Sequence, residues 1–316
     1  MRRKIALVGS GMIGGTLAHL LLQHRLGDVV LYDVVEGLPQ GKALDLWEAG
    51  PIGGWDARVV GTNDIAEIAG ADVCVVTAGS PRKPGMSRDD LLGINARVIS
   101  EVSEAIRRHA PDSFVVVVTN PLDAMVTLAL RVTGFPKQRV VGQAGVLDSA
   151  RYRAFVAAEL GVSVESVHAV VLGGHGDDMV PVRSYCHVGG IPVSRLIPAD
   201  RLDEIEKRVR FAGGEIVQLM GTSAYYSTAH AILRMVESYL LDKKEILPCA
   251  AYLEGEYGMR DLYLGVPVCI GSKGVERVVE LELTTAEKEA LGRSAAHVRE
   301  LVEAMDRVLA GQGERT

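Results

Sequence analysis

The chain has 316 residues, of which 48% are hydrophobic and 23% charged, and its formal net charge at pH 7 is −6. A chain of this length can form two units that each bury a core around a shared cleft, and its ordinary globular composition excludes an intrinsically disordered protein. The mild acidity argues against a nucleic-acid partner, although it leaves room for a locally basic cleft.

The first half of the chain, up to about residue 142, alternates short apolar runs with longer amphipathic segments. The apolar runs are rich in Val and Ile, and we expect each to form a strand: Ile5–Val8, Val29–Tyr32, Val73–Thr77, Phe114–Thr119 and Arg139–Val141. Unbroken apolar strands suit a parallel sheet that is covered on both faces. Helices are expected from about Ser87 to His109 and from Pro121 to just before Gly134. This alternation predicts an α/β fold with a Rossmann, doubly wound parallel sheet in residues 1–143.

Beyond residue 143 the pattern changes. A helix is expected over Leu147–Leu160, a strand over Ser166–Leu172, and two further helices over Asp200–Leu219 and Ser223–Leu241. Gly189-Gly190, the segment from Gly255 to Gly258 and the segment from Gly271 to Gly274 indicate hairpin turns between short strands. A final long helix should begin near Thr284, because Thr284-Thr285-Ala286-Glu287 fits a capping box. We therefore expect residues 144–316 to form a second, α+β domain.

The cysteines, the histidines and the N-terminus give no sign of disulfides, a metal or a membrane span. The cysteines at positions 74, 186, 249 and 269 form no CxxC pair, and the eight histidines form no metal-ligand motif. We interpret the cysteines as buried small side chains in a reducing compartment, and we expect no metal site. The apolar run after the basic N-terminus has only four residues, and no run approaches the ~20 residues of a membrane span, so we expect a cytoplasmic protein.

A glycine-rich turn follows the first expected strand and opens a helix. Its sequence, Gly9-Ser10-Gly11-Met12-Ile13-Gly14, is a GxGxxG motif, and Asp33 ends the second strand 19 residues later. Gly9 permits the tight turn, Gly11 lets the backbone approach a pyrophosphate, and Gly14 lets helix and strand pack closely. Asp33 can accept hydrogen bonds from an adenosine ribose and repels a 2′-phosphate. We therefore predict NAD, and not NADP, as the cofactor; the alternative is a structural turn beside a surface aspartate.

His175 lies among glycines, in Gly173-Gly174-His175-Gly176, directly after an expected strand. The glycines leave space for a ligand beside the imidazole, whose unperturbed pKa suits proton exchange near neutrality. Asp148 and Arg151 are three residues apart, so on a helix they share one face. Asp148 could orient His175 and stabilise its imidazolium form, and Arg151 could bind a carboxylate through two parallel hydrogen bonds. The alternatives are a surface histidine and a local helical ion pair.

A basic loop, from Ala78 to Arg88, follows the expected strand over residues 73–77. It carries Arg82, Lys83 and Arg88 among prolines and glycines. It lies at the carboxyl edge of the parallel strands, where ligands bind in this architecture. This composition predicts a lid that closes over an anion; the alternative is a solvated basic loop.

Together these motifs resemble the lactate/malate dehydrogenase family, and within it the malate dehydrogenases that are built like lactate dehydrogenase. The resemblance covers nearly the whole chain and implies that His175 is the proton acceptor and donor and Asp148 its partner. It also implies that Arg88, carried by the closing loop, polarises the C2 carbonyl of the substrate. The implied substrate contacts are Arg82, Arg88, Asn120, Arg151 and Thr222, where many malate-type members have Gly in place of Thr222. The implied cofactor contacts are Gly9, Gly11, Met12, Ile13, Gly14, Asp33, Asn95, Val118 and Asn120.

The choice of substrate depends on Arg82. In the family, the matching loop position typically carries Gln in the lactate enzymes and Arg in the malate enzymes. Oxaloacetate brings a second carboxylate into a closed site, where an unpaired charge is costly, and Arg82 would neutralise it. Pyruvate offers only a methyl group and would leave Arg82 buried without a partner. The expected activity is therefore the reversible, NAD-dependent oxidation of malate to oxaloacetate, with residues 144–316 as the catalytic and substrate domain.

Three other functions remain open on the sequence alone. A lactate dehydrogenase with an unusual loop would reduce pyruvate, and a non-catalytic NAD-sensing protein would need neither the histidine nor its charged neighbours. An NAD-dependent glycosidase would need a metal-ligating Cys/His pair, and Cys186-His187 fits no recognised motif of that kind. The resemblance also implies a homodimer or homotetramer. The expected binding partner is a small dicarboxylate substrate, and no nucleic-acid or membrane partner is expected.

Overall fold

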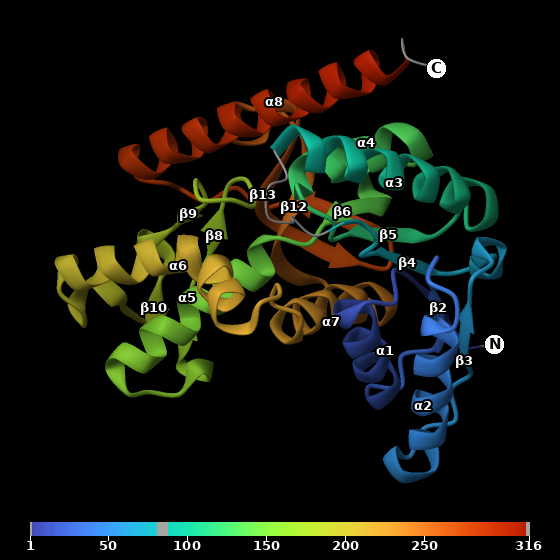
Figure 1. The fold of residues 1–316 in the computed structure, drawn as a ribbon. Coiled ribbons are helices and arrows are strands. Elements are labelled where there is room, and N and C mark those ends of the chain that lie inside the picture. Colours follow the sequence, from blue (N-terminus) through green and yellow to red (C-terminus); the bar gives the residue numbers. More distant parts are fainter. Residues whose placement is uncertain (1, 81–87, 314–316) are drawn as a thin grey trace.

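A nine-stranded sheet forms the centre of the molecule and carries helices on both faces (Figure 1). The structure, a computed structural model, describes residues 2–80 and 88–313, without the side chains of residues 88, 312 and 313. The expected helix start at Ser87 and the lid residue Arg82 therefore lie outside the described residues.

The first half of the chain supplies six parallel strands to this sheet. They are β1 (Lys4–Val8), β2 (Asp28–Tyr32), β3 (Val59–Thr62), β4 (Val73–Val76), β5 (Phe114–Val117) and β6 (Val140–Gly142). Five of them match the expected apolar runs to within two residues, and β3 was not expected. It is only half-buried and contains Gly61, where a Cβ would lie 2.1 Å from Pro39 O. The close approach of α2 leaves no room for a side chain at this position, so the strand lacks an apolar residue there and its sequence pattern is weak.

Eight α-helices surround the sheets within the described residues. They are α1 (Met12–Gln23), α2 (Leu38–Gly53), α3 (Arg88–His109), α4 (Leu122–Thr133), α5 (Gly145–Leu160), α6 (Ala199–Met220), α7 (Tyr226–Leu240) and α8 (Thr285–Gly313). The expected capping box before α8 is confirmed, because Thr284 N donates to Glu287 Oε2 at 2.9 Å and Glu287 N to Thr284 Oγ1 at 3.3 Å. None of the described helices combines the length and apolar character needed to cross a bilayer.

Short 3₁₀ helices connect several of these elements. They are η1 (Ile65–Ile68), η2 (Lys137–Arg139), η3 (Val164–Ser166), η4 (Arg183–Tyr185), η5 (Val193–Arg195) and η6 (Glu256–Gly258).

The second half of the chain supplies the remaining strands. They are β7 (Val167–His168), β8 (Val171–Leu172), β9 (Val180–Pro181), β10 (His187–Val188), β11 (Ile191–Pro192), β12 (Glu245–Glu254), β13 (Arg260–Gly271) and β14 (Gly274–Val278). The single strand expected over residues 166–172 is wrong: β7 pairs with β10, whereas β8 pairs with β9, so the chain changes sheets between them. The glycine turns at 189–190, 255–258 and 271–274 do join hairpins.

The central sheet joins both halves of the chain in the order β14-β13-β12-β6-β5-β4-β1-β2-β3. The strands β1 to β6 run parallel, which confirms the doubly wound sheet, and β12 pairs antiparallel with β6 through Ala250 and Gly142. The predicted division at residue 143 thus falls next to β6, and three strands beyond it extend the same sheet.

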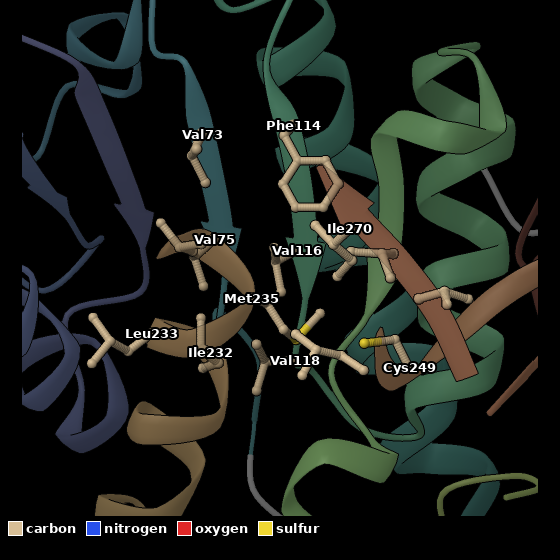
Figure 2. Packing of buried hydrophobic residues seen from close by; sticks show 14 of the residues in the cluster. Val73, Val75, Phe114, Val116, Val118, Ile232, Leu233, Met235, Cys249 and Ile270 are labelled. Atoms are coloured by element: carbon tan, nitrogen blue, oxygen red, sulfur yellow. The ribbon is translucent and has the colours of Figure 1, made fainter. Parts of the chain in front are cut away.

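Alternating strand residues supply two apolar cores, one on each face of the sheet. In β4, Val73 and Val75 face the layer of α1 and α7, whereas Cys74 and Val76 face the layer of α3, α4 and α8. Figure 2 shows Val75 of β4 and Val116 of β5 packed next to Ile232 and Met235 of α7. Burial on both faces holds the carboxyl ends of the parallel strands in place, and it is there that the candidate site lies.

Candidate active site

The glycine-rich turn joins the end of β1 to the start of α1. Gly9 has a φ of +111°, which L side chains rarely adopt, and a Cβ at Gly14 would lie 2.0 Å from Gly9 O. By contrast, a Cβ at Gly11 would meet no described protein atom within 4 Å, so the space beside this backbone is open to a ligand. Met12 begins α1 without a side-chain cap among the described residues, which leaves backbone N–H groups available for an anion.

Asp33 follows β2 and is half-buried beside the turn. Its Oδ2 accepts a hydrogen bond from Ser10 N at 2.7 Å and its Oδ1 one from Val35 N at 3.0 Å, and further lone pairs remain for a ribose. Lys42 Nζ of α2 donates hydrogen bonds to the carbonyl oxygens of Ser10 and Gly11, both at 2.7 Å, and so stabilises the turn. Burial lowers the pKa of Lys42, which the charge of Asp33 opposes. The open Gly11 backbone and the oriented carboxylate fit the pyrophosphate and adenosine ends of NAD.

Asn95 links the loops that follow β4 and β5. Its side chain is 1% exposed; Oδ1 accepts from Ser80 N at 2.7 Å, while Nδ2 donates to Ser80 O at 3.1 Å and to Asn120 O at 2.7 Å. Asn120 is exposed at the turn into α4, and Val118 is nearly buried. The amide of Asn95 is thus occupied by backbone groups, and its expected contact with the cofactor stays a prediction.

The structure brings together three charged or titratable side chains that the sequence singled out: His175 and Arg151 both contact Asp148. His175 lies in the loop between β8 and β9, and its Nδ1 lies 2.9 Å from Asp148 Oδ2. Arg151 Nη1 donates to the other oxygen, Asp148 Oδ1, at 3.1 Å, because α5 places both residues on one face. Since Nδ1 faces the carboxylate, Nε2 is the ring nitrogen left for a reacting hydroxyl group.

The charges around His175 favour its protonated form. Burial by itself would lower the pKa of His175, but the charge and hydrogen bond of Asp148, together with the charge of Asp123, raise it above its usual value. The nearby Arg151 opposes this rise. A ring whose imidazolium form is supported in this way can carry a proton near neutral pH.

A cavity of about 510 Å³ lies in front of these groups, and its lining includes Arg151, His175, Met179 and Arg210. Arg151 Nε is buried and has no hydrogen-bond partner among the described residues, so this guanidinium retains capacity for a carboxylate. Thr222, expected near the substrate, is exposed between α6 and α7 and does not line this cavity. Arg82 and the side chain of Arg88, both expected to contact the substrate, lie outside the described residues.

Three residues at the site were not identified from the sequence: Lys42, Arg210 and Asp123. Arg210 Nε donates to Met179 O at 3.2 Å, and Asp123 Oδ2 accepts from His175 N at 2.8 Å. None of the three had a distinctive sequence signal: even Asp123 is an acidic residue in the first turn of a helix, which is an ordinary position for one. Within the part of the chain that the structure describes, no group of three or more His, Cys, Asp or Glu side chains could hold a metal ion.

Comparison with protein families matches both halves of the chain. Residues 3–142 match the NAD binding domain of lactate/malate dehydrogenase, and residues 145–310 match the alpha/beta C-terminal domain of the same family.

Individual relatives match this chain over nearly its full length. The chain is 56% identical over 305 residues to a malate dehydrogenase of Thermomicrobium roseum, covering 96% of this chain and 99% of that protein. Among solved structures, a malate dehydrogenase from Salinibacter ruber superposes with a TM-score of 0.94 at 47% identity, covering 98% and 99% of the two chains. A lactate dehydrogenase from Cryptosporidium parvum, complexed with lactic acid and nicotinamide adenine dinucleotide, has the same TM-score at 44% identity, covering 97% and 98%. The fold alone therefore does not separate the two activities.

The open space beside Gly11 leads to a test of cofactor binding. We expect Gly11→Ala to fold with an unchanged Tm, because the new methyl group meets no protein atom, but to bind NADH about tenfold more weakly, because it enters the space of the pyrophosphate. Fluorescence titration with NADH measures the affinity. The matched control is Gly292→Ala in α8, where an added Cβ also meets no described atom and the affinity should stay unchanged. Equal affinities in both variants would contradict the placement of the pyrophosphate.

Proposed function

This chain belongs to the lactate/malate dehydrogenase family, and we propose that it acts as an NAD-dependent malate dehydrogenase, which interconverts malate and oxaloacetate. Within the structure, this proposal depends on the contact of 2.9 Å between His175 Nδ1 and Asp148 Oδ2, with Arg151 beside them at one cavity. Oxidation of a 2-hydroxyacid needs a base for the hydroxyl proton and a cation for the carboxylate, and this group supplies both.

The first domain would hold the cofactor. The turn from Gly9 to Gly14, with Met12 and Ile13, would bind the pyrophosphate, and Asp33 the adenosine ribose. Asn95, Val118 and Asn120 complete the proposed cofactor contacts. When bound, NAD supplies the hydride acceptor for malate oxidation, and its reduced form supplies the hydride donor for the reverse reaction.

The second domain would move the proton. Arg151 binds the C1 carboxylate of malate, and His175 Nε2 takes the proton of the C2 hydroxyl. Asp148 then stabilises the imidazolium that forms. In the reverse direction the imidazolium returns this proton to oxaloacetate. Asn120 and Thr222 are further proposed substrate contacts.

The loop arginines would complete the site. Arg88 polarises the C2 carbonyl, and Arg82 neutralises the distal carboxylate that distinguishes oxaloacetate from pyruvate. Closure of the loop would exclude water and strengthen both interactions. A binding protein that only senses NAD is not favoured, because it would not need the charged pair beside His175.

The proton-transfer role of His175 can be tested directly. We expect His175→Asn to lower kcat about 1,000-fold or more, because Asn cannot carry the proton, while the affinity for NADH stays unchanged. Oxaloacetate-dependent oxidation of NADH, followed by absorbance, measures the rate. His109→Asn at the end of α3 serves as the matched control and should retain the rate. A nearly normal kcat in His175→Asn would refute the assignment.

The role of Arg82 in selecting the substrate requires a comparison of two substrates. We expect Arg82→Gln to shift the ratio of kcat/KM values for oxaloacetate and pyruvate towards pyruvate, because the cationic partner proposed for the distal carboxylate is lost. Lys83→Gln removes the same charge from the same loop and should leave the ratio nearly unchanged. If Arg82→Gln lowered both values equally, Arg82 would be a general anion-binding residue and not a selector.

We further propose that the enzyme is a homo-oligomer, a dimer or a tetramer, with α2 in an interface between copies. Three large apolar side chains of α2 are exposed: Leu44, Trp47 and Ile52 are 56%, 63% and 93% exposed. Exposed apolar side chains gathered on one helix are costly to leave in water and are typical of a surface covered by a partner.

This interface leads to a test of assembly. We expect Ile52→Glu to shift the protein towards monomers in sedimentation velocity, because a charge would be buried in the interface. Ile246→Glu also adds a charge at an exposed apolar position, but on β12, and should leave the assembly unchanged. An unchanged sedimentation coefficient for Ile52→Glu would argue against an interface at α2.

We also propose a cytoplasmic location. All four cysteines are buried, as expected. Free thiols at these positions would suit a reducing compartment. Burial raises the pKa of the Cys74 thiol to about 12, so this side chain acts as a small apolar group and not as a thiolate.

A further inference from the structure

A second buried carboxylate lies behind the catalytic histidine. Asp123 stands in the first turn of α4 and is 3% exposed. Its Oδ2 accepts a hydrogen bond of 2.8 Å from the backbone N–H of His175. Its Oδ1 is buried and has no hydrogen-bond partner among the described residues. Asp123 therefore contacts the backbone of His175, whereas Asp148 contacts the ring.

Three separate elements hold the backbone of residues 173–175, in the loop that carries His175. Gly173 exchanges two backbone hydrogen bonds with Gly265 of β13, at 2.9 and 3.0 Å, and Gly174 N donates to Ser294 Oγ of α8 at 2.9 Å. Asp123 supplies the third of these backbone contacts, through His175 N, and it is the only charged partner among the three. The loop backbone packs directly on this carboxylate, because a Cβ at Gly174 would lie 3.3 Å from Asp123 Oδ2.

The charge of Asp123 is costly where it lies. Burial raises its pKa to about 6, while the hydrogen bond from His175 N and the positive charge of the ring act in the opposite direction. The carboxylate of Asp178, in the same loop as His175, adds to the rise. A neutral acceptor such as the Ser294 hydroxyl holds the neighbouring residue without this cost. A mere tether would therefore not need a carboxylate.

We propose that Asp123 is a positioning residue for proton transfer: its carboxylate fixes the backbone of His175 and, as a second negative charge besides Asp148, favours the imidazolium form of the ring. The inference rests on the proposed function, because it requires that His175 carries the proton. Arg151 opposes the effect from α5. Asp178, whose own partner is His297 of α8 at 3.1 Å, acts on Asp123 and raises the pKa of that carboxyl group.

The sign of the expected pH effect follows from this arrangement. Without the negative charge of Asp123, the imidazolium is less favoured, so the pKa of His175 falls. Malate oxidation needs the neutral ring and oxaloacetate reduction needs the imidazolium. The acidic limb of the oxidation profile and the basic limb of the reduction profile should therefore both move to lower pH.

The decisive variant is Asp123→Asn, which keeps an oxygen that can accept from His175 N but removes the charge. We expect it to move both limbs of the kcat/KM profiles to lower pH by roughly half a unit to one unit, with kcat reduced. Ser294→Ala is the matched control, because it removes a neutral contact to the same loop. It should lower kcat while its limbs stay at the pH of the unmodified enzyme. Limbs that do not move in Asp123→Asn would overturn the proposal.

A second measurement does not depend on turnover. Because the pKa of Asp123 is higher in the folded protein than in the unfolded chain, protonation of this carboxyl group stabilises the fold. This stabilisation is complete below the pKa that Asp123 has in the unfolded chain, and it is lost as the pH rises through about 6. The difference in Tm between Asp123→Asn and the unmodified protein should therefore shift in favour of the variant between about pH 4 and pH 6, and level off above this range, where the carboxyl group is ionised in both states. A difference that keeps shifting up to pH 8 would show that the carboxyl group stays protonated in the fold, which also overturns the proposal.

The two proposals fail in different ways. If the unmodified enzyme did not reduce oxaloacetate, or if His175→Asn kept its rate, the proposed function would be wrong. If the unmodified enzyme were active and His175→Asn inactive, but the limbs of Asp123→Asn did not move, only the role of Asp123 would be wrong.

Discussion

The hydrogen bond between His175 and Asp148 is the interaction on which the rest of the site depends. It turns Nδ1 of the ring towards a carboxylate that is 2% exposed, and it leaves Nε2 for the substrate. A buried carboxylate would be unstable without partners, and Arg151 on the next turn of α5 supplies one. The same arginine faces the cavity, so one helix face orients the base and can also bind the substrate.

The position of this pair requires almost the whole fold. The loop of His175 is held by α4, α8 and β13, which lie far apart in the sequence. The cofactor turn lies at the carboxyl edge of the parallel strands, where the buried cores on both faces of the sheet keep it rigid. Asn95 then ties the loops after β4 and β5 to each other. The residues proposed to bind substrate and cofactor are therefore positioned by packing and not by proximity in the chain.

Local patterns predicted much of this architecture, because strand burial, turns and caps depend on neighbouring residues. The strands β1, β2, β4, β5 and β6, the glycine turn and the cap of α8 could be recognised in this way. The strand β3 could not, since Gly61 satisfies a tertiary contact with α2. Asp123 was missed for a related reason: an acid in a first helical turn is ordinary, and only the folded chain brings it to the His175 backbone. The exposed position of Thr222 likewise depends on how the turn between α6 and α7 folds.

The single sheet shared by both halves has a consequence for biosynthesis. β6 ends at Gly142, but its neighbour β12 begins only at Glu245, and the sheet is complete only with β14, which ends at Val278. While the ribosome makes the intervening hundred or so residues, the backbone groups of β6 have no neighbour on that side. An unpaired edge of apolar residues is a ready template for association with other chains. The nascent cofactor domain thus remains a candidate for chaperone binding until the last hairpin has been synthesised.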